Sequence, residues 1–270
     1  MHELLVRTVS GVVFVALLLG CILASPFAFA ALGLIVLSIG TFEMFRLFKF
    51  KAKGHLVCGC VFALSSYIIA GMVALNLLPM HWLLLEIPIF MLPLLEALFS
   101  KSDDITSVLT YSYVSLIFLA LPLALMLFMY REDLFGTMSG SMLLILVFVT
   151  LWVNDIFAYL TGKLLGKHKL FPRISPGKTI EGSLGGLIFT VISVMIFSHY
   201  IEWMSPWFAI GFALIVVVFG TLGDLCESML KRHADAKDSG KLIPGHGGVL
   251  DRFDSVMFSV PFIFVYLLLL

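Results

Sequence analysis

Residues 206–232 have the sequence PWFAIGFALIVVVFGTLGDLCESMLKR, and this stretch decides the fold class. It begins as an apolar run long enough to cross a membrane, since a spanning helix needs about 20 mostly apolar residues. Its end carries Asp224, Glu227 and Lys231. Ionisable side chains inside a membrane are costly, and their presence there suggests a functional role. The stretch therefore predicts a transmembrane helix that ends in a polar site.

The composition of the whole chain extends this prediction. Of its 270 residues, 61% are hydrophobic and only 13% are charged, whereas soluble domains have about 45–50% apolar and about 25% charged residues. Basic and acidic residues number 17 each, so the net positive charge on which nucleic-acid binding depends is absent. We therefore expect an all-α polytopic integral membrane protein that binds no nucleic acid.

Hydrophobic runs of spanning length recur along the chain. At about 17–25 residues per span, they divide it into about nine transmembrane helices. Their approximate bounds are 8–25, 27–45, 56–78, 81–99, 108–129, 140–160, 183–200, 206–230 and 252–270. A cleaved signal peptide is the alternative for residues 1–24, but the apolar pattern continues directly into the next span.

The basic residues support this count and give an orientation. With the N-terminus in the cytoplasm and the C-terminus outside, every basic residue except Arg131 falls in a cytoplasmic segment, as the positive-inside rule requires. We expect residues 1–130 to form a scaffold of membrane helices, and residues 131–270 to form catalytic membrane helices with active-site loops facing the cytoplasm, without a separate soluble domain. Short loops and the lack of tails suggest the inner (plasma) membrane of a bacterium.

The intramembrane carboxylates fall into two groups. Glu43 lies close to Arg46 in sequence, so an interfacial ion pair is expected, and Glu86 and Glu96 are expected to have structural roles. The second group lies at the cytoplasmic ends of helices that lead into charged loops, and comprises Asp155, Asp224 and Glu227. This second group is the more promising for function, because such carboxylates are rarely retained without a role.

The loop that follows Lys231 combines carboxylates, basic residues and glycines. Asp251 and Asp254 are three residues apart at the start of the last span and so share one helix face. Residues 244–248 are Pro-Gly-His-Gly-Gly, which allows an anion to approach the backbone next to a helix N-terminus. The basic residues available for phosphate oxygens are Lys231, Arg232, Lys237, Lys241 and Arg252. Since carboxylates bind hard cations such as Mg²⁺ together with substrate phosphates, the loop predicts a metal–phosphate site.

The other inner loop has a similar character. Asp155 and Tyr159 are followed by the sequence SPGKTIEG at 175–182. Gly177-Lys178-Thr179 is not a P-loop, because position 172 is a proline and no parallel β-sheet context is expected here. Capping of the following helix explains Ser175 or Thr179, but it does not explain Lys178.

The segment 228–254 resembles the signature of the phosphatidate cytidylyltransferase (CDP-diacylglycerol synthase) family. The matching residues are SMLKR at 228–232, Lys237-Asp238, and PGHGGVLDRFD at 244–254. Residues 155–159 and 175–182 resemble the family's second conserved stretch, although the family more often has lysine at the place of Gly177 and an aromatic residue at that of Ile180. The resemblance covers the C-terminal part of the chain well and the first half only through hydrophobicity.

This resemblance implies a nucleotidyltransferase of phospholipid biosynthesis that converts CTP and phosphatidate, a membrane lipid, into CDP-diacylglycerol and pyrophosphate. Mg²⁺ would be required, with Asp224 and Asp251 as its ligands and Asp155, Glu227 and Asp254 as further candidates. The catalytic residues would be Asp224, Lys231, Asp251 and Asp254. The substrate- and phosphate-binding residues would be Ser175, Lys178, Thr179, Ser228, Arg232, Lys237, Lys241, His246, Gly247, Gly248 and Arg252. The family also suggests a homodimer and leaves open a second, monovalent cation such as K⁺.

Two other functions are compatible with parts of the pattern. A cation- or proton-coupled transporter would use Asp155, Asp224 and Glu227 as coupling carboxylates, but it leaves the His-Gly-Gly run without a role. A CDP-alcohol phosphotransferase would need a D-G-x-x-A-R core, which this sequence lacks. The cytidylyltransferase reaction needs no Ser or Cys nucleophile, since the phosphate of the lipid attacks CTP, and metal ions with fixed positive groups offset the repulsion between the anions.

Overall fold

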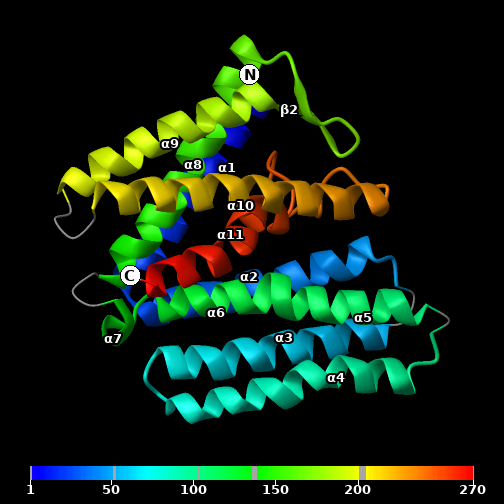
Figure 1. Cartoon of the computed structure of the whole chain (residues 1–270). Coiled ribbons are helices and arrows are strands. Elements are labelled where there is room, and N and C mark those ends of the chain that lie inside the picture. Colours follow the sequence, from blue (N-terminus) through cyan, green and yellow to red (C-terminus); the bar gives the residue numbers. More distant parts are fainter. Residues whose placement is uncertain (1, 51–52, 103, 136–138, 201–204, 270) are drawn as a thin grey trace. The chain divides into compact units, whose positions relative to one another are not determined.

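The computed structural model describes residues 2–50, 53–102, 104–135, 139–200 and 205–269. These residues are mainly helical, with one short β-hairpin (Figure 1). The first helices are α1 (His2–Ala24), α2 (Pro26–Leu47), α3 (Lys53–Ala74), η1 (Met80–Leu85), α4 (Glu86–Phe99), α5 (Ile105–Val114), the π-helical η2 (Ser115–Ala120), α6 (Leu121–Phe128) and α7 (Glu132–Phe135). They are followed by α8 (Gly140–Leu165), β1 (Lys169–Phe171), β2 (Ser175–Thr179), α9 (Ile180–Tyr200), α10 (Pro206–His233) and α11 (Leu250–Leu268). The predicted all-α membrane class is confirmed.

Eight helical segments in the described part of the chain are long and apolar enough to cross a membrane. They coincide with the first eight predicted spans. The ninth predicted span forms helix α11, but its first two turns hold Asp251, Arg252 and Asp254, and α11 is not among the eight. Leu270, the last residue of that predicted span, lies outside the described residues. The structure thus supports eight spans by length and composition, and the orientation of the chain stays a prediction.

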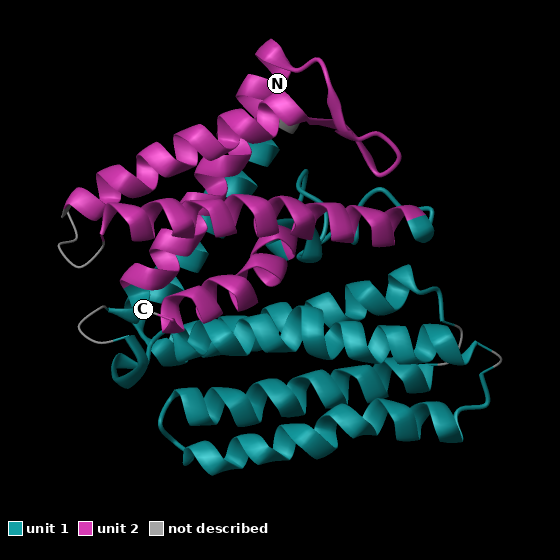
Figure 2. Cartoon of the chain, viewed as in Figure 1, with its two compact units in different colours: residues 1–141, 233–253 teal, residues 142–232, 254–270 magenta. Residues whose placement is uncertain are grey.

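The chain forms two compact units (Figure 2). Unit 1 consists of residues 1–141 and 233–253, and unit 2 of residues 142–232 and 254–270. The segment 233–253, which carries much of the family-like signature, therefore folds with the N-terminal helices. The functional division into a scaffold up to residue 130 and a catalytic part after it stays a prediction.

Unit 1 is built around α3, which packs against α2, α4, α5 and α6. These helices lie side by side in Figure 1. Their interior contains large buried side chains whose polar ends reach neighbouring backbone: the hydroxyl of Tyr67 donates to the carbonyl of Ala30 at 3.1 Å, and that of Tyr111 to the carbonyl of Thr41 at 3.4 Å. Each tyrosine fills the apolar core and satisfies its hydroxyl within it, as burial of a polar group requires.

Unit 2 contains the β-hairpin, α9, nearly all of α8 and α10, and α11 from residue 254 onward. Strands β1 and β2 pair antiparallel, with Lys169 opposite Thr179 and Phe171 opposite Ser175. Helix α9 follows β2 directly and approaches α8 closely at Gly182. A Cβ on Gly182 would lie only 2.7 Å from the carbonyl oxygen of Ala158 and 2.9 Å from Oγ1 of Thr179. Only glycine fits this crossing, which brings the end of α8 to the hairpin.

We predict that Gly182→Ala destabilises the protein, because the added methyl group forces α8 and α9 apart. Overpacking of this kind costs about 1–3 kcal/mol of unfolding free energy. Gly20→Ala is the matched control, since a Cβ on Gly20 meets nothing within 4 Å. Thermal unfolding in detergent should show a lower midpoint for Gly182→Ala alone, and equal midpoints for the two variants would contradict the close crossing.

Candidate functional site

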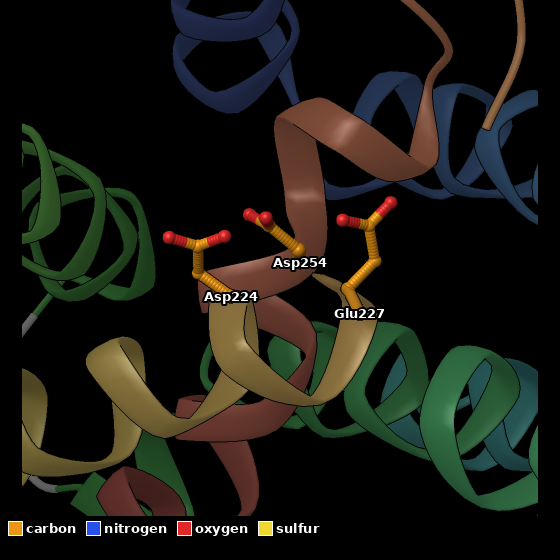
Figure 3. A group of neighbouring side chains, drawn as sticks. All are labelled: Asp224, Glu227 and Asp254. Carbon is orange, nitrogen blue, oxygen red and sulfur yellow. The ribbon is translucent and has the colours of Figure 1, made fainter. Parts of the chain in front are cut away.

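Three carboxylates gather in unit 2, from two helices. Asp224 and Glu227 lie on successive turns of α10, and Asp254 lies in the first turns of α11. One ligand oxygen from each lies within 4.8 Å of the other two, and Figure 3 shows all three side chains pointing to the same side of their helices. Glu227 is fully buried, while Asp224 and Asp254 are half-buried. Three converging oxygen ligands with little solvent around them suit a hard divalent cation.

Two lysines pair with this acidic cluster. The ammonium group of Lys178, in β2, pairs with Asp224, and that of Lys231 pairs with Glu227 one turn earlier on α10. The Ser228 hydroxyl also donates to Oδ1 of Asp224 at 3.3 Å. Because three buried carboxylates would repel one another, the lysines offset much of their charge. The structure therefore brings together six of the residues singled out in the sequence, with Ser228 among them.

A polar cavity of about 400 Å³ in unit 2 adjoins Asp224. Its walls come from the end of α8, from β2, from the start of α9 and from α10, and the lining residues are Asn154, Asp155, Ala158, Tyr159, Gly162, Lys163, Ser175, Gly177, Lys178, Thr179, Gly182, Ser183, Thr221 and Asp224. The volume lies within the range of small-molecule sites. Both predicted stretches, 155–159 and 175–182, thus contribute to one cavity.

The start of α9 is held by two side chains near its first residue. Oγ1 of Thr179 accepts from the amide of Gly182 at 3.1 Å and caps the helix, as predicted for Ser175 or Thr179. Ser175 lies four residues earlier, in β2. Glu181 accepts from the amide of Lys167 at 3.0 Å and contacts Nδ1 of His168 at 2.6 Å, which closes the loop before β1. These contacts fix the strand that presents Lys178.

In unit 1, Asp251 organises the loop that precedes α11. Its Oδ2 accepts from the amides of Gly248 at 2.7 Å and Ser239 at 2.9 Å, and the hydroxyl oxygen of Ser239 also lies 2.9 Å away. Gly247 has a φ of +86°, a conformation that favours glycine, and a Cβ there would lie 2.6 Å from Oδ2 of Asp251. The predicted metal ligand Asp251 is thus held within unit 1, and its role toward a metal stays a prediction.

Glu43 of α2 has other partners than the sequence suggested. Glu43 is 4% exposed, and its carboxylate accepts from the amides of Val249 and Leu250 at 3.1 and 3.0 Å. The hydroxyl of Ser239, which also contacts Asp251, lies 3.0 Å from the same carboxylate. Among the described residues no ion pair joins it to Arg46, so the expected interfacial pair is wrong. Glu43 instead caps the start of α11, where the N–H groups of a helix lack partners within the helix.

The remaining predicted phosphate contacts lie at separate places. Lys237 and Lys241 are exposed and line a cavity of unit 1 together with Arg46 and Lys49. Nδ1 of His246 lies 2.9 Å from the hydroxyl of Ser10 on α1. The other two basic residues are exposed on the last turn of α10 and the first turn of α11, and are Arg232 and Arg252.

We predict that Glu43→Gln loosens the loop before α11. The two carboxylate oxygens of Glu43 each accept from a different amide. Glutamine has one acceptor oxygen, so the amide of Val249 or that of Leu250 loses its partner. Hydrogen bonds to a charged group are worth about 1.5–3 kcal/mol each, which corresponds to roughly tenfold to hundredfold faster amide exchange. Hydrogen exchange measured by mass spectrometry should show this change in the segment containing Val249 and Leu250.

Glu96→Gln is the matched control for this measurement. Glu96 is also a buried glutamate of unit 1, but it contacts Ser112 and His55 rather than the loop. Unchanged exchange around Leu250 in Glu43→Gln, or the same increase in Glu96→Gln, would contradict the capping role of Glu43.

Comparison with known proteins places these residues in a family. The sequence model of the cytidylyltransferase family matches residues 5–270. A phosphatidate cytidylyltransferase of Staphylococcus aureus (strain COL) is 47% identical over 131 residues, 48% of this chain and 50% of the relative. That of Staphylococcus saprophyticus is 45% identical over 143 residues, 52% of this chain and 54% of the relative. The chain spans about half the length of the curated relatives it matches, and by the match over residues 5–270 it belongs to the cytidylyltransferase family.

Proposed function

We propose that the protein is a phosphatidate cytidylyltransferase, which joins CTP and phosphatidate to give CDP-diacylglycerol and pyrophosphate. The observation that carries the proposal is the convergence in unit 2 of three carboxylates and two lysines next to a polar cavity. Family membership and the similarity to proteins named phosphatidate cytidylyltransferase support the same activity. A cavity with these groups suits a reaction between two phosphate-bearing substrates.

The residues of the acidic cluster fit a divalent cation such as Mg²⁺. All three ligands are carboxylate oxygens, the donors that Mg²⁺ prefers, and substrate phosphates commonly complete its shell. Asp224, Glu227 and Asp254 would hold the ion, with Asp155 nearby in the cavity wall and Asp251 as a further candidate. When bound, the ion would polarise phosphoryl oxygens and offset the charge of departing pyrophosphate.

The chain's own groups account for the rest of the chemistry. In the reaction an oxygen of the lipid phosphate forms a bond to the α-phosphorus of CTP, and the bond from that phosphorus to the β-phosphate oxygen breaks. Pyrophosphate leaves with the bonding electrons, so no protein nucleophile is required. Lys178 and Lys231 place positive charge beside the acidic cluster, where it lowers the repulsion between the two anionic substrates.

The predicted topology agrees with the supply of both substrates. With the N-terminus in the cytoplasm, the polar ends of α8 and α10 face the cytoplasm, from which CTP arrives. Phosphatidate carries its phosphate at the headgroup level of the same membrane face. A plasma-membrane location with a cytoplasmic active site, a homodimer, and K⁺ as a second cation all belong to this proposal.

The first test is pyrophosphate release by the purified protein in detergent. We expect release only when CTP, phosphatidate and Mg²⁺ are all present, together with a lipid that carries CMP. Omission of each component in turn is the control. Folded protein that releases no pyrophosphate under these conditions would exclude the activity, and ion flux in liposomes would then test the transporter alternative.

We predict that Asp224→Asn lowers kcat by about 100-fold or more while the protein stays folded, because a ligand charge is lost at nearly constant shape. Asp251→Asn is expected to have a similar effect if Asp251 also serves the metal. Asp235→Asn is the matched control, since Asp235 is an exposed acid whose ion pair with Lys49 contributes little. Full activity in purified Asp224→Asn would contradict the assignment of the acidic cluster.

A further inference from the structure

Another cavity of unit 1 lies between α1 and the loop that precedes α11. Its volume is about 540 Å³, which lies within the range of small-molecule sites. The lining residues are Arg7, Thr8, Gly11, Val12, Val15, Ala16 and His246. None of these except His246 was singled out from the sequence.

The two ends of the cavity differ in chemistry. Arg7 and His246 supply a guanidinium and an imidazole, and the described residues that line the cavity include no carboxylate. The wall that continues along α1 is formed by Val12, Val15 and Ala16, which offer no side-chain hydrogen-bonding group. From Arg7 to Ala16 a helix rises roughly 13 Å. The cavity therefore has a basic end and an apolar wall that runs into a predicted membrane span.

The orientation of His246 follows from its neighbours. The Ser10 hydroxyl lies 2.9 Å from the carbonyl of Pro244 and 3.0 Å from that of Arg7, and both carbonyls can only accept. Nδ1 of His246 lies 2.9 Å from the same Ser10 oxygen and therefore faces α1. The other nitrogen, Nε2, lies on the side of Gly11, where an added Cβ would be 3.6 Å away. Nε2 is thus presented at the cavity wall.

We propose that this cavity binds the lipid substrate, a lipid whose headgroup is a phosphate monoester. The phosphate would lie at Arg7 and His246, since a guanidinium binds phosphate oxygens through paired charge-assisted hydrogen bonds. One acyl chain would lie along Val12, Val15 and Ala16. This proposal rests on the proposed function, because it assigns a place to the phosphatidate of that reaction.

The surroundings favour a lipid over a nucleotide or free phosphate. On the same helix Val9, Val12, Val13 and Leu17 are all more than half exposed, as expected for a helix surface in contact with acyl chains. A nucleotide base would need hydrogen-bonding partners, and Val12, Val15 and Ala16 provide none. Free phosphate would bind the basic end alone and gain nothing from the apolar wall. The occupant that matches both ends carries a phosphate and a hydrocarbon chain.

Two substitutions test the two ends separately. Arg7→Gln removes the charge at the basic end, and Gly11→Leu fills the apolar part with a side chain. Their matched controls are Lys101→Gln, which removes an exposed cation of another predicted cytoplasmic loop, and Gly20→Leu on the same helix, where nothing lies within 4 Å of the added Cβ. Thermal unfolding of all four purified proteins shows which are folded.

The first readout is binding without CTP. The full chain in detergent is titrated with phosphatidate, with phosphatidylcholine and with inorganic phosphate, and bound lipid is counted by native mass spectrometry. We expect phosphatidate to bind in preference to phosphatidylcholine, with a Kd that rises about tenfold or more in Arg7→Gln and Gly11→Leu and stays unchanged in both controls. Competition by inorganic phosphate as effective as by phosphatidate would overturn the role of the apolar wall.

The second readout is kinetic and separates this proposal from the proposed function. In Arg7→Gln the KM for phosphatidate should rise about tenfold while the KM for CTP stays unchanged. Active protein in which neither Arg7→Gln nor Gly11→Leu changes phosphatidate binding or its KM would overturn the lipid site and leave the enzyme assignment intact. Wild-type protein that binds phosphatidate through Arg7 but transfers no CMP would support the lipid site and contradict the enzyme assignment.

Discussion

The contact on which much of the structure depends is the buried carboxylate of Glu43 at the start of α11. It accepts from two backbone amides and contacts Ser239, so one side chain of α2 holds both the first residues of a helix and the loop before it. Asp251 shares Ser239 with Glu43 and closes the same loop from the other side. Helix α11 then carries Asp254, a member of the acidic cluster. A helix of the predicted scaffold thereby fixes the segment that leads into the candidate site.

Charge compensation is the second constraint, and it explains the composition of the site. Asp224, Glu227 and Asp254 bring three carboxyl groups close together, and positive neighbours offset the repulsion between them. Lys178 and Lys231 are these neighbours, on β2 and α10. The same lysines are suited to contact phosphates, so groups that stabilise the folded protein are also useful to the proposed reaction. The polar cavity beside Asp224 gives such substrates a place to bind.

Features encoded within short stretches of sequence were predicted well. Hydrophobic runs predicted the eight helices of spanning length, whereas the charged start of α11 keeps this ninth predicted span out of the eight. Helical spacing placed Asp224 and Glu227 at one helix end. The sequence assigned Lys178 and Asp224 to the same candidate site, but it did not predict that they form an ion pair. Glu43 and Ser10 were missed because each acts through residues about 200 or more positions away, and hydrophobic periodicity carries no information on such contacts. Because Glu43 is close to Arg46 in sequence, a local ion pair was expected. In the structure Glu43 is buried and instead accepts from the backbone amides at the start of α11.

The single hydroxyl of Ser239 lies within hydrogen-bonding distance of Glu43, from the N-terminal half, and of Asp251, from the C-terminal half. This geometry makes the loop depend on both halves of the chain, although the motifs quoted from residues 228–254 lie in the second. A change at any of the three positions alters the partners of the other two. A chimaera that joins the N-terminal half of one family member to the C-terminal half of another would therefore retain this loop only where both parents supply the same three groups. The inconspicuous first half of the chain is thus under a specific chemical constraint, in addition to the general demand for hydrophobicity.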